Sequence, residues 1–330
     1  MSSSWTGFRS PLADGITRYL DTKRALGCRF ASEERTLRLL DRFLVQQDIT
    51  TTEAITGNML GRFVASRPRP VARSYNHLLG VVRRLFDWLV SQGVLHSSPL
   101  QTRPKRETAK RLPFLFNPPL ARRLLDCAAA LPDNNRSRYR GPTYRTIFAL
   151  LYGLGLRVGE VSRLQCGDVD LEHDVLLIRD SKFGKSRLVP FGPKLAQVLR
   201  SYLDGHPLRA QFSESTVPLF SWNGRRPVST NSIRNVFRER LLPQLQLEIP
   251  DGTTHPRVHD LRHSFAVGTL LRWYRQGVDP SARLHHLSTF LGHVNPVTTA
   301  VYLTITSDLL AEANRRFEAF AAPKELGVGS

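Results

Sequence analysis

A short, basic and proline-rich segment limits the fold of this chain more than any other feature, because it separates two apolar regions. Residues 97–113 (SSPLQTRPKRETAKRLP) contain three prolines and five lysines or arginines, but few large apolar side chains. Such a composition is typical of an exposed linker. The length of 330 residues also fits about two domains of roughly 150 residues each. We therefore expect one domain at residues 1–100, a basic linker at 101–115 and a second domain at 116–330.

Hydrophobic periodicity predicts that the first domain is helical. Apolar residues recur on one face of Ser32–Gln47, with Ser32 as the expected N-cap. A shorter helix is expected at Ile55–Ala65, and a longer apolar stripe follows it and ends at Gly93. These patterns favour a helical domain over residues 1–100.

The first domain also carries an excess of positive charge. Between Ala54 and Phe86 there are six arginines and no acidic residue, and the whole chain has a formal charge of +19. Such an excess favours a polyanionic partner, with arginines on backbone phosphates, although an ordinary solvated basic face is the alternative. The candidate DNA-binding residues, three of them in the linker, are Arg62, Arg67, Arg69, Arg73, Arg83, Arg84, Arg103, Lys105 and Arg106.

The second domain is predicted to be of mixed character. Three short runs bounded by turn residues indicate a small antiparallel sheet: Val169–Leu171, Val175–Arg179 and Arg187–Pro190. The rest reads as helices, and the last is an amphipathic helix at 307–320. The expected fold class is therefore mainly α with a small antiparallel β-sheet, arranged as two domains.

Composition disfavours several classes of protein. No segment approaches the ~18 continuous apolar residues of a membrane span, and the N-terminus MSSSWTGFRS lacks the apolar core of a signal peptide. Cys28, Cys127 and Cys166 are odd in number and far apart, which fits buried thiols in a reducing compartment. We therefore expect a cytoplasmic protein that binds nucleic acid and no membrane.

Two arginines in distinctive frames suggest phosphate chemistry. Arg157 lies in GLRVGE and Arg262 in HDLRH. A guanidinium matches phosphate oxygens with two parallel hydrogen bonds and stays charged at all relevant pH values. Each arginine could instead form a structural salt bridge, and Glu160 is a ready partner for Arg157 one turn away.

Histidines accompany these arginines. His259 and His263 are four residues apart, so they share one helical face beside Arg262, and His293 follows downstream in LGH. Imidazoles move protons near neutral pH. An HxxxH pair can also bind metal, but the glutamate of an HExxH motif is absent. We therefore expect no metal site.

A lysine and a tyrosine complete the set. Lys182 is predicted on a turn between two strands, where it could protonate a leaving oxygen, and Lys185 competes for that role in the same loop. Tyr302 lies nine positions after His293 and could act as a nucleophile if neighbouring cations favour its ionisation. A turn lysine and a core tyrosine are the structural alternatives.

The sequence resembles the tyrosine recombinase (phage integrase) family in four ordered frames: LGLRVGE, SKFGKSRLVP, HDLRHSFA and LGHVNPVTTAVY. The resemblance covers residues ~116–306 with specific motifs and extends more weakly to residues ~10–100, which look like the family's helical core-binding domain. The RLVP tail of the second frame favours Lys182 over Lys185. The resemblance implies six catalytic residues: Arg157, Lys182, His259, Arg262, His293 and Tyr302.

In such an enzyme Tyr302 would attack the scissile phosphate to give a 3′-phosphotyrosyl link, and Lys182 would protonate the leaving 5′ oxygen. Arg157 and Arg262 would bind the non-bridging oxygens. No metal, cofactor or ATP is implied, because the covalent link keeps the energy of the broken bond.

The two remaining histidines have supporting roles by the same resemblance. His259 would assist proton transfer, and His293 would support the phosphate or the nucleophile by hydrogen bonding. The family further implies a nucleoid-associated protein that binds double-stranded DNA with a specific recombination site. It also implies homo- or hetero-tetramers on two DNA sites, with the helix at 307–320 either lent to a neighbour or packed on its own domain.

The expected function is therefore site-specific DNA recombination or integration, for a mobile genetic element. Three alternatives remain from the residues themselves. A catalytically silent relative would only occupy its DNA site, a type IB topoisomerase-like enzyme would relax supercoils without a specific site, and a histidine-cluster nuclease would need metal.

Overall fold

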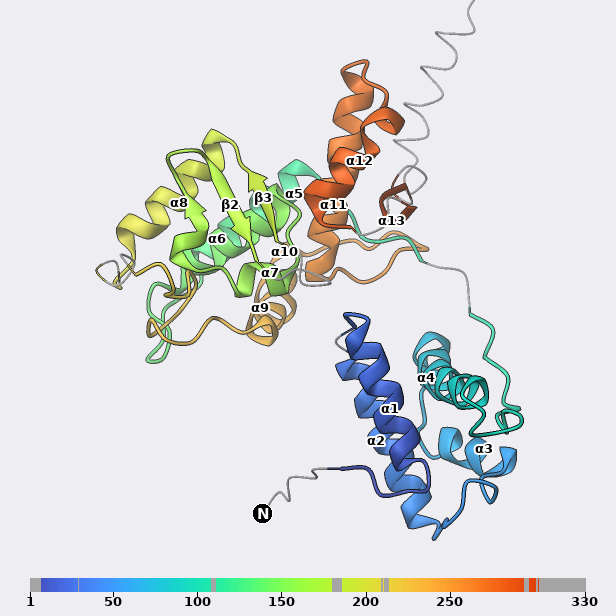
Figure 1. The fold of residues 1–330 in the computed structure, drawn as a ribbon. Coiled ribbons are helices and arrows are strands. Elements are labelled where there is room, and N and C mark those ends of the chain that lie inside the picture. Colours follow the sequence, from blue (N-terminus) through green and yellow to red (C-terminus); the bar gives the residue numbers. More distant parts are fainter. Residues whose placement is uncertain are drawn as a thin grey trace, which may run out of the picture. The chain divides into compact units, whose positions relative to one another are not determined.

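The chain divides into two compact units, residues 1–110 and 111–330 (Figure 1). We call these the N-terminal and C-terminal units and describe each by itself. The computed structural model describes residues 7–28, 30–107, 111–179, 186–208, 210, 214–293, 297–300 and 302.

The N-terminal unit is built from helices around one apolar core. Leu37, Leu40 and Leu44 face this core together with Leu78 and Leu85, and all five are fully buried. The spacing of these leucines in sequence, three, four or seven residues apart, is what places them on one face of each helix. The helices are α1 (Ala13–Ala25), α2 (Ala31–Gln46), α3 (Gly57–Ala65) and α4 (Ala72–Ser91).

The start of α2 differs from the sequence expectation. Ser32 was predicted to cap this helix, but the helix begins at Ala31 and Phe30 occupies the N-cap with a left-handed backbone, φ 47°. Glu33 and Glu34 still lie in the first turn, where they oppose the positive end of the helix dipole. The predicted cap was wrong by two residues, and the residue at the N-cap, Phe30, packs edge-on against Tyr19 with 5.9 Å between the ring centres.

Part of the segment predicted as a linker is bound to α4. The Asn76 side chain both donates to the Lys105 carbonyl and accepts from the Lys105 backbone N–H, each at 2.8 Å. Arg83 donates to the Thr102 carbonyl at 2.9 Å, and the Lys105 ammonium lies 4.5 Å from the centre of the Tyr75 ring. Residues 102–105 are therefore fixed on the N-terminal unit, although most of their side chains are exposed.

At its other end the same segment joins the C-terminal unit. Leu112 pairs with the loop that precedes helix α11 (Val258–Arg275), since its N–H donates to the Gly252 carbonyl at 3.0 Å. Phe114 and Phe116 are buried in that unit's core.

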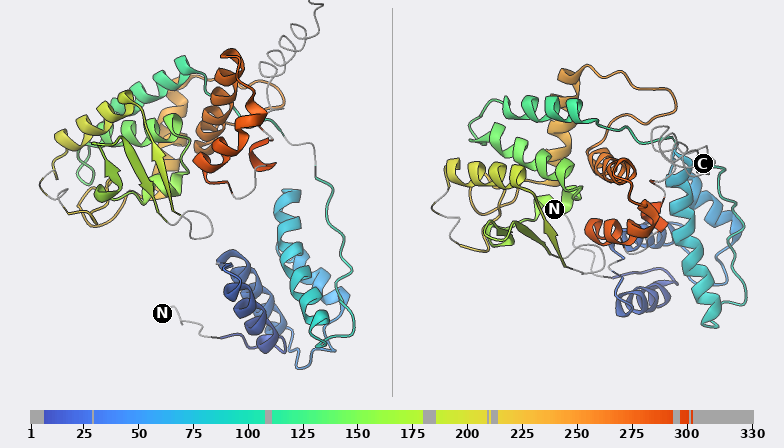
Figure 2. Two further views of the ribbon diagram at one scale, coloured as in Figure 1. Left: turned by 45° about the horizontal axis from the view of Figure 1, so that its top comes forward. Right: turned by 90° about the horizontal axis from the view of Figure 1, so that it is seen from above.

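The C-terminal unit combines helices with one small sheet (Figure 2). Helix α6 lies at its centre and contacts α5, α8 and α11. The helices are α5 (Pro118–Ala129), α6 (Arg140–Gly153), α7 (Val158–Ser162), α8 (Pro193–Gly205), α9 (Thr230–Val236), α10 (Leu242–Leu245), α11 (Val258–Arg275), α12 (Pro280–Leu291) and α13 (Val297–Ala300), with a 3-10 turn at Cys166–Asp168 and a π-helical turn at Phe237–Leu241.

The sheet has three antiparallel strands in sequence order: β1 (Val169–Asp170), β2 (Val175–Ile178) and β3 (Arg187–Pro190). Its register pairs Ile178 with Arg187, so β2 and β3 form a hairpin whose connecting residues include 180–185. The expectation of a mainly helical chain with a small antiparallel sheet is confirmed.

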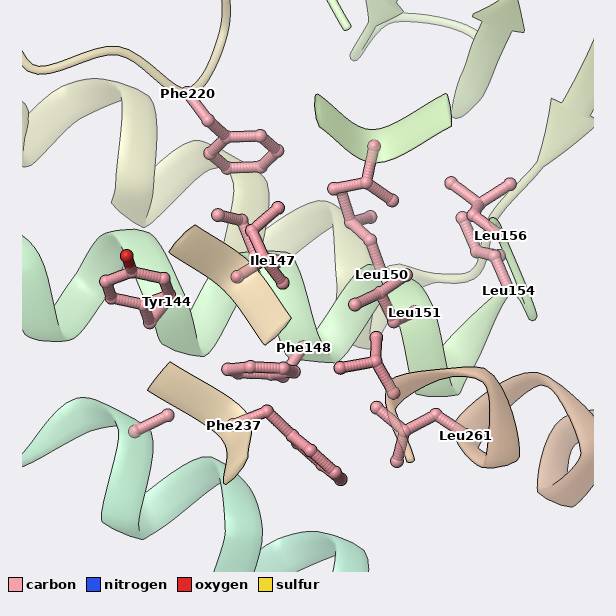
Figure 3. Close-up of a cluster of buried hydrophobic side chains, with 14 of the residues drawn as sticks. Tyr144, Ile147, Phe148, Leu150, Leu151, Leu154, Leu156, Phe220, Phe237 and Leu261 are labelled. Atoms are coloured by element: carbon pink, nitrogen blue, oxygen red, sulfur yellow. The ribbon is translucent and has the colours of Figure 1, made fainter. Parts of the chain in front are cut away.

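The core of the C-terminal unit gathers on α6, whose buried face includes aromatic and aliphatic side chains (Figure 3). Phe148 lies 5.8 Å from Phe237, centre to centre, and Leu261 of α11 approaches the same cluster. Burying an aromatic or leucine side chain stabilises the fold by about 1.5–3 kcal/mol. This packing fixes the ends of α6 and α11, and the functional residues lie near those ends.

Two further findings concern membranes and the C-terminus. In the part of the chain that the structure describes, no helix has the length and apolar character needed to span a bilayer. The predicted helix at 307–320 lies outside the described residues.

Candidate active site

The site is assembled at the C-terminal end of α12, where a helix leaves backbone carbonyls without intrahelical partners. Three successive carbonyls there each accept a hydrogen bond from a different arginine. Arg187 donates to Phe290 at 2.8 Å, Arg262 to Leu291 at 2.6 Å and Arg157 to Gly292 at 2.9 Å. The negative end of the helix dipole also favours cations at this position.

One buried glutamate holds two of these arginines. Glu160 accepts from Arg157 Nη1 at 2.7 Å and from Arg187 at 3.1 Å and 3.0 Å. Its other contact is the Arg157 backbone N–H at 2.9 Å, which closes the first turn of α7. Burial alone would raise the pKa of Glu160, but Arg187 and Arg157 outweigh it and lower the pKa to about 2. The carboxylate is therefore a permanent counter-ion.

The salt bridge with Glu160 that the sequence offered as a structural alternative for Arg157 is present in the fold. The same guanidinium also reaches Gly292, beside the predicted site residue His293. Its ion pair therefore orients the side chain into the site.

Arg262 is held differently. It is 1% exposed and donates to the carbonyls of Gly155, at 2.7 Å, and Leu291. Burial and the nearby charge of Arg157 lower its pKa to about 10, so it is still a cation at neutral pH. Within the described residues its buried Nε has no hydrogen-bond partner. An unsatisfied buried donor is costly, and an incoming anion would satisfy it.

Two glycines make these carbonyls accessible. Gly155 has φ +60° and Gly292 has φ +66°, a left-handed conformation that side chains disfavour. A Cβ at Gly155 would lie 2.6 Å from the Phe265 ring, and one at Gly292 would lie 2.7 Å from Arg187 Nη1. Both positions therefore require glycine for conformation and for space.

The Tyr302 hydroxyl lies within this cluster. Tyr302 is 4% exposed, and its hydroxyl is 2.9 Å from His263 Nδ1. The His293 ring stacks on the Tyr302 ring at 6.4 Å with a 20° angle between planes. His259 packs edge-on against His263 at 4.7 Å, one turn earlier on α11.

His293 is fixed by a chain of hydroxyl groups. Its Nδ1 is 2.7 Å from Thr299 Oγ1, which is 2.8 Å from Ser288 Oγ. Thr299 and Ser288 are both buried. This chain holds the imidazole parallel to the Tyr302 ring.

The protonation states follow from burial and charge. Removal from water, assisted by cations that include Arg262, lowers the pKa values of His259, His263 and His293 to about 4 each. These imidazoles are therefore neutral near pH 7. Burial raises the pKa of Tyr302, with a partial opposing effect from Arg262 and Arg157, so the resting phenol keeps its proton.

Five of the six predicted catalytic residues therefore meet in one place: Arg157, His259, Arg262, His293 and Tyr302. Lys182 and its competitor Lys185 lie outside the described residues. Among the described residues no three His, Cys, Asp or Glu side chains are grouped as they would be to hold a metal ion.

The predicted DNA-binding residues lie in the N-terminal unit and are mostly exposed. Arg62 bonds to Gln47, Arg69 donates to Ser74 at 3.0 Å, and Arg83 donates to Thr102. Arg73, Arg84, Arg103, Lys105 and Arg106 are exposed, and Arg67 is half-buried.

Sequence reasoning gave no site role to Arg187 and Thr299, and it named His263 only as a second imidazole on the helical face of His259, without a contact to Tyr302. Arg187 and His263 both stand inside motifs that were recognised, RLVP and HDLRH. Two signals were available in the sequence. Arg187 begins the predicted strand that follows Lys182, and His263 is four residues from His259 on the same helix. Nothing in the sequence marks Thr299 as a partner for His293.

The model of the phage integrase family matches residues 124–308. The putative integrase/recombinase y4rB of Sinorhizobium fredii is 34% identical, over 94% of this chain and 98% of that protein. The chain belongs to the phage integrase family. The tyrosine recombinase XerC of Serratia marcescens is 28% identical, over 90% of this chain and 91% of that protein.

Solved structures share the fold of this phage integrase family member. The Tn1549 transposon integrase in complex with transposon right end DNA has a TM-score of 0.62 at 17% identity, covering 93% of this chain and 99% of that one. A lambda integrase dimer bound to a COC′ core site has a TM-score of 0.60 at 16% identity, covering 88% and 76%. Family membership assigns the chain to the enzymes of site-specific DNA recombination, which cleave and rejoin DNA.

Proposed function

We propose that this chain cleaves one DNA strand by attack of Tyr302 on a scissile phosphate and later rejoins it from the 3′-phosphotyrosyl link. The observation that carries the proposal is the burial of the Tyr302 hydroxyl in one cluster with Arg262 and Arg157. Positive charges preplaced around a nucleophile stabilise the additional negative charge of a phosphoryl-transfer transition state.

Arg157 and Arg262 bind the non-bridging oxygens in this proposal. Each guanidinium is already oriented by the end of α12, so binding a phosphate needs little reorganisation. The unpartnered Nε of Arg262 supports this role, because it is a donor for which the described part of the protein provides no acceptor.

Lys182 protonates the leaving 5′ oxygen. The support is the hairpin from which the lysine segment comes: Arg187, at the start of β3, is tied to Glu160 and to the Phe290 carbonyl. The strand that follows the lysine segment is thereby anchored at the site. His259 assists proton transfer, and His293 supports the phosphate or the Tyr302 ring.

The reaction needs neither metal nor ATP in this proposal. The arginines supply the charge that a metal would otherwise supply, and the phosphotyrosyl bond keeps the energy of the phosphodiester for the rejoining step.

We further propose that the chain acts on the nucleoid as a tetramer on two copies of a specific site, and that it moves a mobile element. Residues 1–100, within the N-terminal unit, form the core-binding domain, and the exposed arginines of this unit contact phosphates. The fold shared with a transposon integrase bound to transposon end DNA supports this role.

The test is capture of the covalent adduct. The full-length protein is incubated with a random-sequence library of nicked suicide duplexes, and denaturant-resistant protein–DNA adducts are isolated and sequenced. We expect wild type to enrich a defined site without magnesium or ATP, and Tyr302→Phe to give no adduct. An adduct formed by Tyr302→Phe contradicts the proposal, as does an adduct lost on adding EDTA. Relaxation of any plasmid without site preference would instead favour a topoisomerase-like activity.

A further inference from the structure

His263 is the imidazole in direct contact with the candidate nucleophile. Its Nδ1 is 2.9 Å from the Tyr302 hydroxyl oxygen, and the two ring centres are 5.4 Å apart. A contact of this length is a hydrogen bond. His263 therefore touches the atom that forms the new bond to phosphorus.

The other side of the His263 ring lies beside a buried carboxylate. Nε2 faces the buried carboxylate of Asp260, with a distance of 4.0 Å to Oδ1. Asp260 is held by the Arg257 backbone N–H at 2.8 Å at the start of α11. The same Oδ1 accepts from Arg257 Nη2 at 3.3 Å. In the tautomer of His263 with its proton on Nε2, the lone pair of Nδ1 accepts from the Tyr302 hydroxyl.

The neighbouring side chains are engaged elsewhere or cannot accept a proton. Nδ1 of His293 is bound to Thr299, and its ring lies face to face with the Tyr302 ring. Arg262 is a cation and can only donate. Of the described groups around the hydroxyl, His263 has both the geometry and the chemistry of a proton acceptor.

We propose that His263 is the general base that removes the proton from Tyr302 during DNA cleavage, an inference that rests on the proposed nucleophilic role of Tyr302. The Tyr302 oxygen attacks phosphorus while its proton passes to His263 Nδ1. The bond from phosphorus to the 5′ oxygen breaks, and that oxygen takes a proton from its own donor, proposed above as Lys182. In rejoining, the 5′ hydroxyl attacks phosphorus and gives its proton back to that donor. The bond from phosphorus to the Tyr302 oxygen breaks, and His263 returns its proton to the departing tyrosine.

The charges around His263 set when it can accept the proton. In the free protein the imidazole is a weak base, because burial and nearby cations lower its pKa to about 4. The scissile phosphate adds negative charge beside those cations and raises the proton affinity of the ring. The titratable and charged groups that face it are Arg257, His259, Asp260, Arg262, His293 and Tyr302.

The first measurement is the rate of adduct formation on the duplex enriched by wild type. His263→Asn keeps a polar side chain near the tyrosine but cannot take up a proton, and His263→Ala removes the contact. We expect both to cleave about 10²-fold more slowly, the range of general base catalysis. His285→Asn makes the same change at an exposed histidine on α12 and should keep the wild-type rate. Wild-type rates in both His263 variants would overturn the proposal.

Two further readouts separate a base from a structural support. A duplex with sulfur in place of the bridging 5′ oxygen needs no proton on its leaving group, so it restores variants that lack the acid but should not restore His263→Asn. The wild-type rate should rise with pH to a plateau as the imidazole loses its proton, and His263→Asn should lose that plateau. Rescue by sulfur, or a slower variant with the wild-type pH profile, would overturn the proposal.

The inference can fail separately from the proposed function. If Tyr302→Phe gives no adduct while His263→Asn behaves as wild type, Tyr302 remains the nucleophile and another group takes its proton. If Tyr302→Phe still forms the adduct, the proposed function itself is wrong.

Discussion

Two glutamates, one in each unit, hold two arginines apiece and differ chiefly in burial. In the N-terminal unit Glu34 binds Arg24 and Arg38 at 2.5 Å and 2.6 Å, with 20% of its side chain exposed. In the C-terminal unit the side chain of Glu160 is 2% exposed and binds Arg157 and Arg187. Water screens the first network, whereas the second lies where charges interact strongly and cannot be rehydrated easily.

This difference separates two uses of arginine in one chain. Arginines of the N-terminal unit are mostly exposed, which suits many weak contacts with a polyanion. Arg262 and Arg187 of the C-terminal unit are largely buried and are held by backbone carbonyls, which suits fixed geometry around one phosphate. Burial therefore distinguishes the arginines expected to do chemistry from those expected to bind.

The largest expected effect comes from neutralising the two glutamates. Glu160→Gln leaves two partly buried arginines without their counter-charge and should lower the free energy of unfolding by about 3 kcal/mol. Glu34→Gln is the matched control and should cost about 1 kcal/mol or less, because its pair is partly solvated. Urea unfolding of the full-length variants measures both. Equal losses of unfolding free energy in the two variants would show that burial does not make the Glu160 network stronger than the Glu34 network.

Mild acid should affect the C-terminal unit selectively. His259, His263 and His293 have folded pKa values near 4, whereas unfolded histidines titrate near ~6.5. The unfolded chain therefore takes up protons first, so stability present above pH ~6.5 is lost progressively as the pH falls to about 4. We expect a loss of roughly 2–3 kcal/mol, discounted because His259 reaches solvent.

Hydrogen exchange of the full-length protein between pH 7 and 4.5 resolves where this loss occurs. Amides of α6 and α11 should lose protection relative to those of α2 and α4, after correction for the intrinsic rate. A parallel loss in both units would mean that His259, His263 and His293 do not control stability in this pH range. Glu160 should add to this loss of stability only as the pH falls below 4.5, the usual pKa of a glutamate, toward its folded pKa of about 2.

The smallest structural effect is expected for an exposed arginine of the N-terminal unit. Arg73→Ala should change stability by less than about 0.5 kcal/mol. It should also reduce the slope of log affinity against log salt by about 1, because one phosphate contact is lost. Arg24→Ala is the control: this arginine is already paired with Glu34, so the slope should stay at the wild-type value. An unchanged slope for Arg73→Ala would argue against a phosphate contact.

Much of the fold follows from local patterns. The apolar spacing of Leu37, Leu40 and Leu44 predicted α2, and short β-branched and leucine-rich runs predicted the three strands within a residue or two. The start of α2 was missed: Phe30, not Ser32, occupies the N-cap, and Phe30 packs against Tyr19. Local propensity is a weak guide wherever a tertiary contact competes with it.

The site was predictable in its residue types but not in its supports. Ordered motifs identified Arg157, Arg262 and Tyr302, since each stands in a distinctive frame. No pattern identifies a backbone carbonyl as an acceptor, because every residue has one. Contacts such as His263 with Tyr302 span 39 positions and need the fold to bring α11 to the tyrosine.

The end of α12 has a consequence for how this enzyme can diverge. Its three carbonyl acceptors belong to the main chain, so substitutions at Phe290 or Leu291 change the side chain and leave the acceptor in place. Of these three residues, Gly292 alone combines an acceptor with a required residue type. Side-chain substitutions around the arginines can therefore accumulate without removing the carbonyls that hold them. The DNA-facing surface of related proteins can change while the reaction centre keeps its geometry.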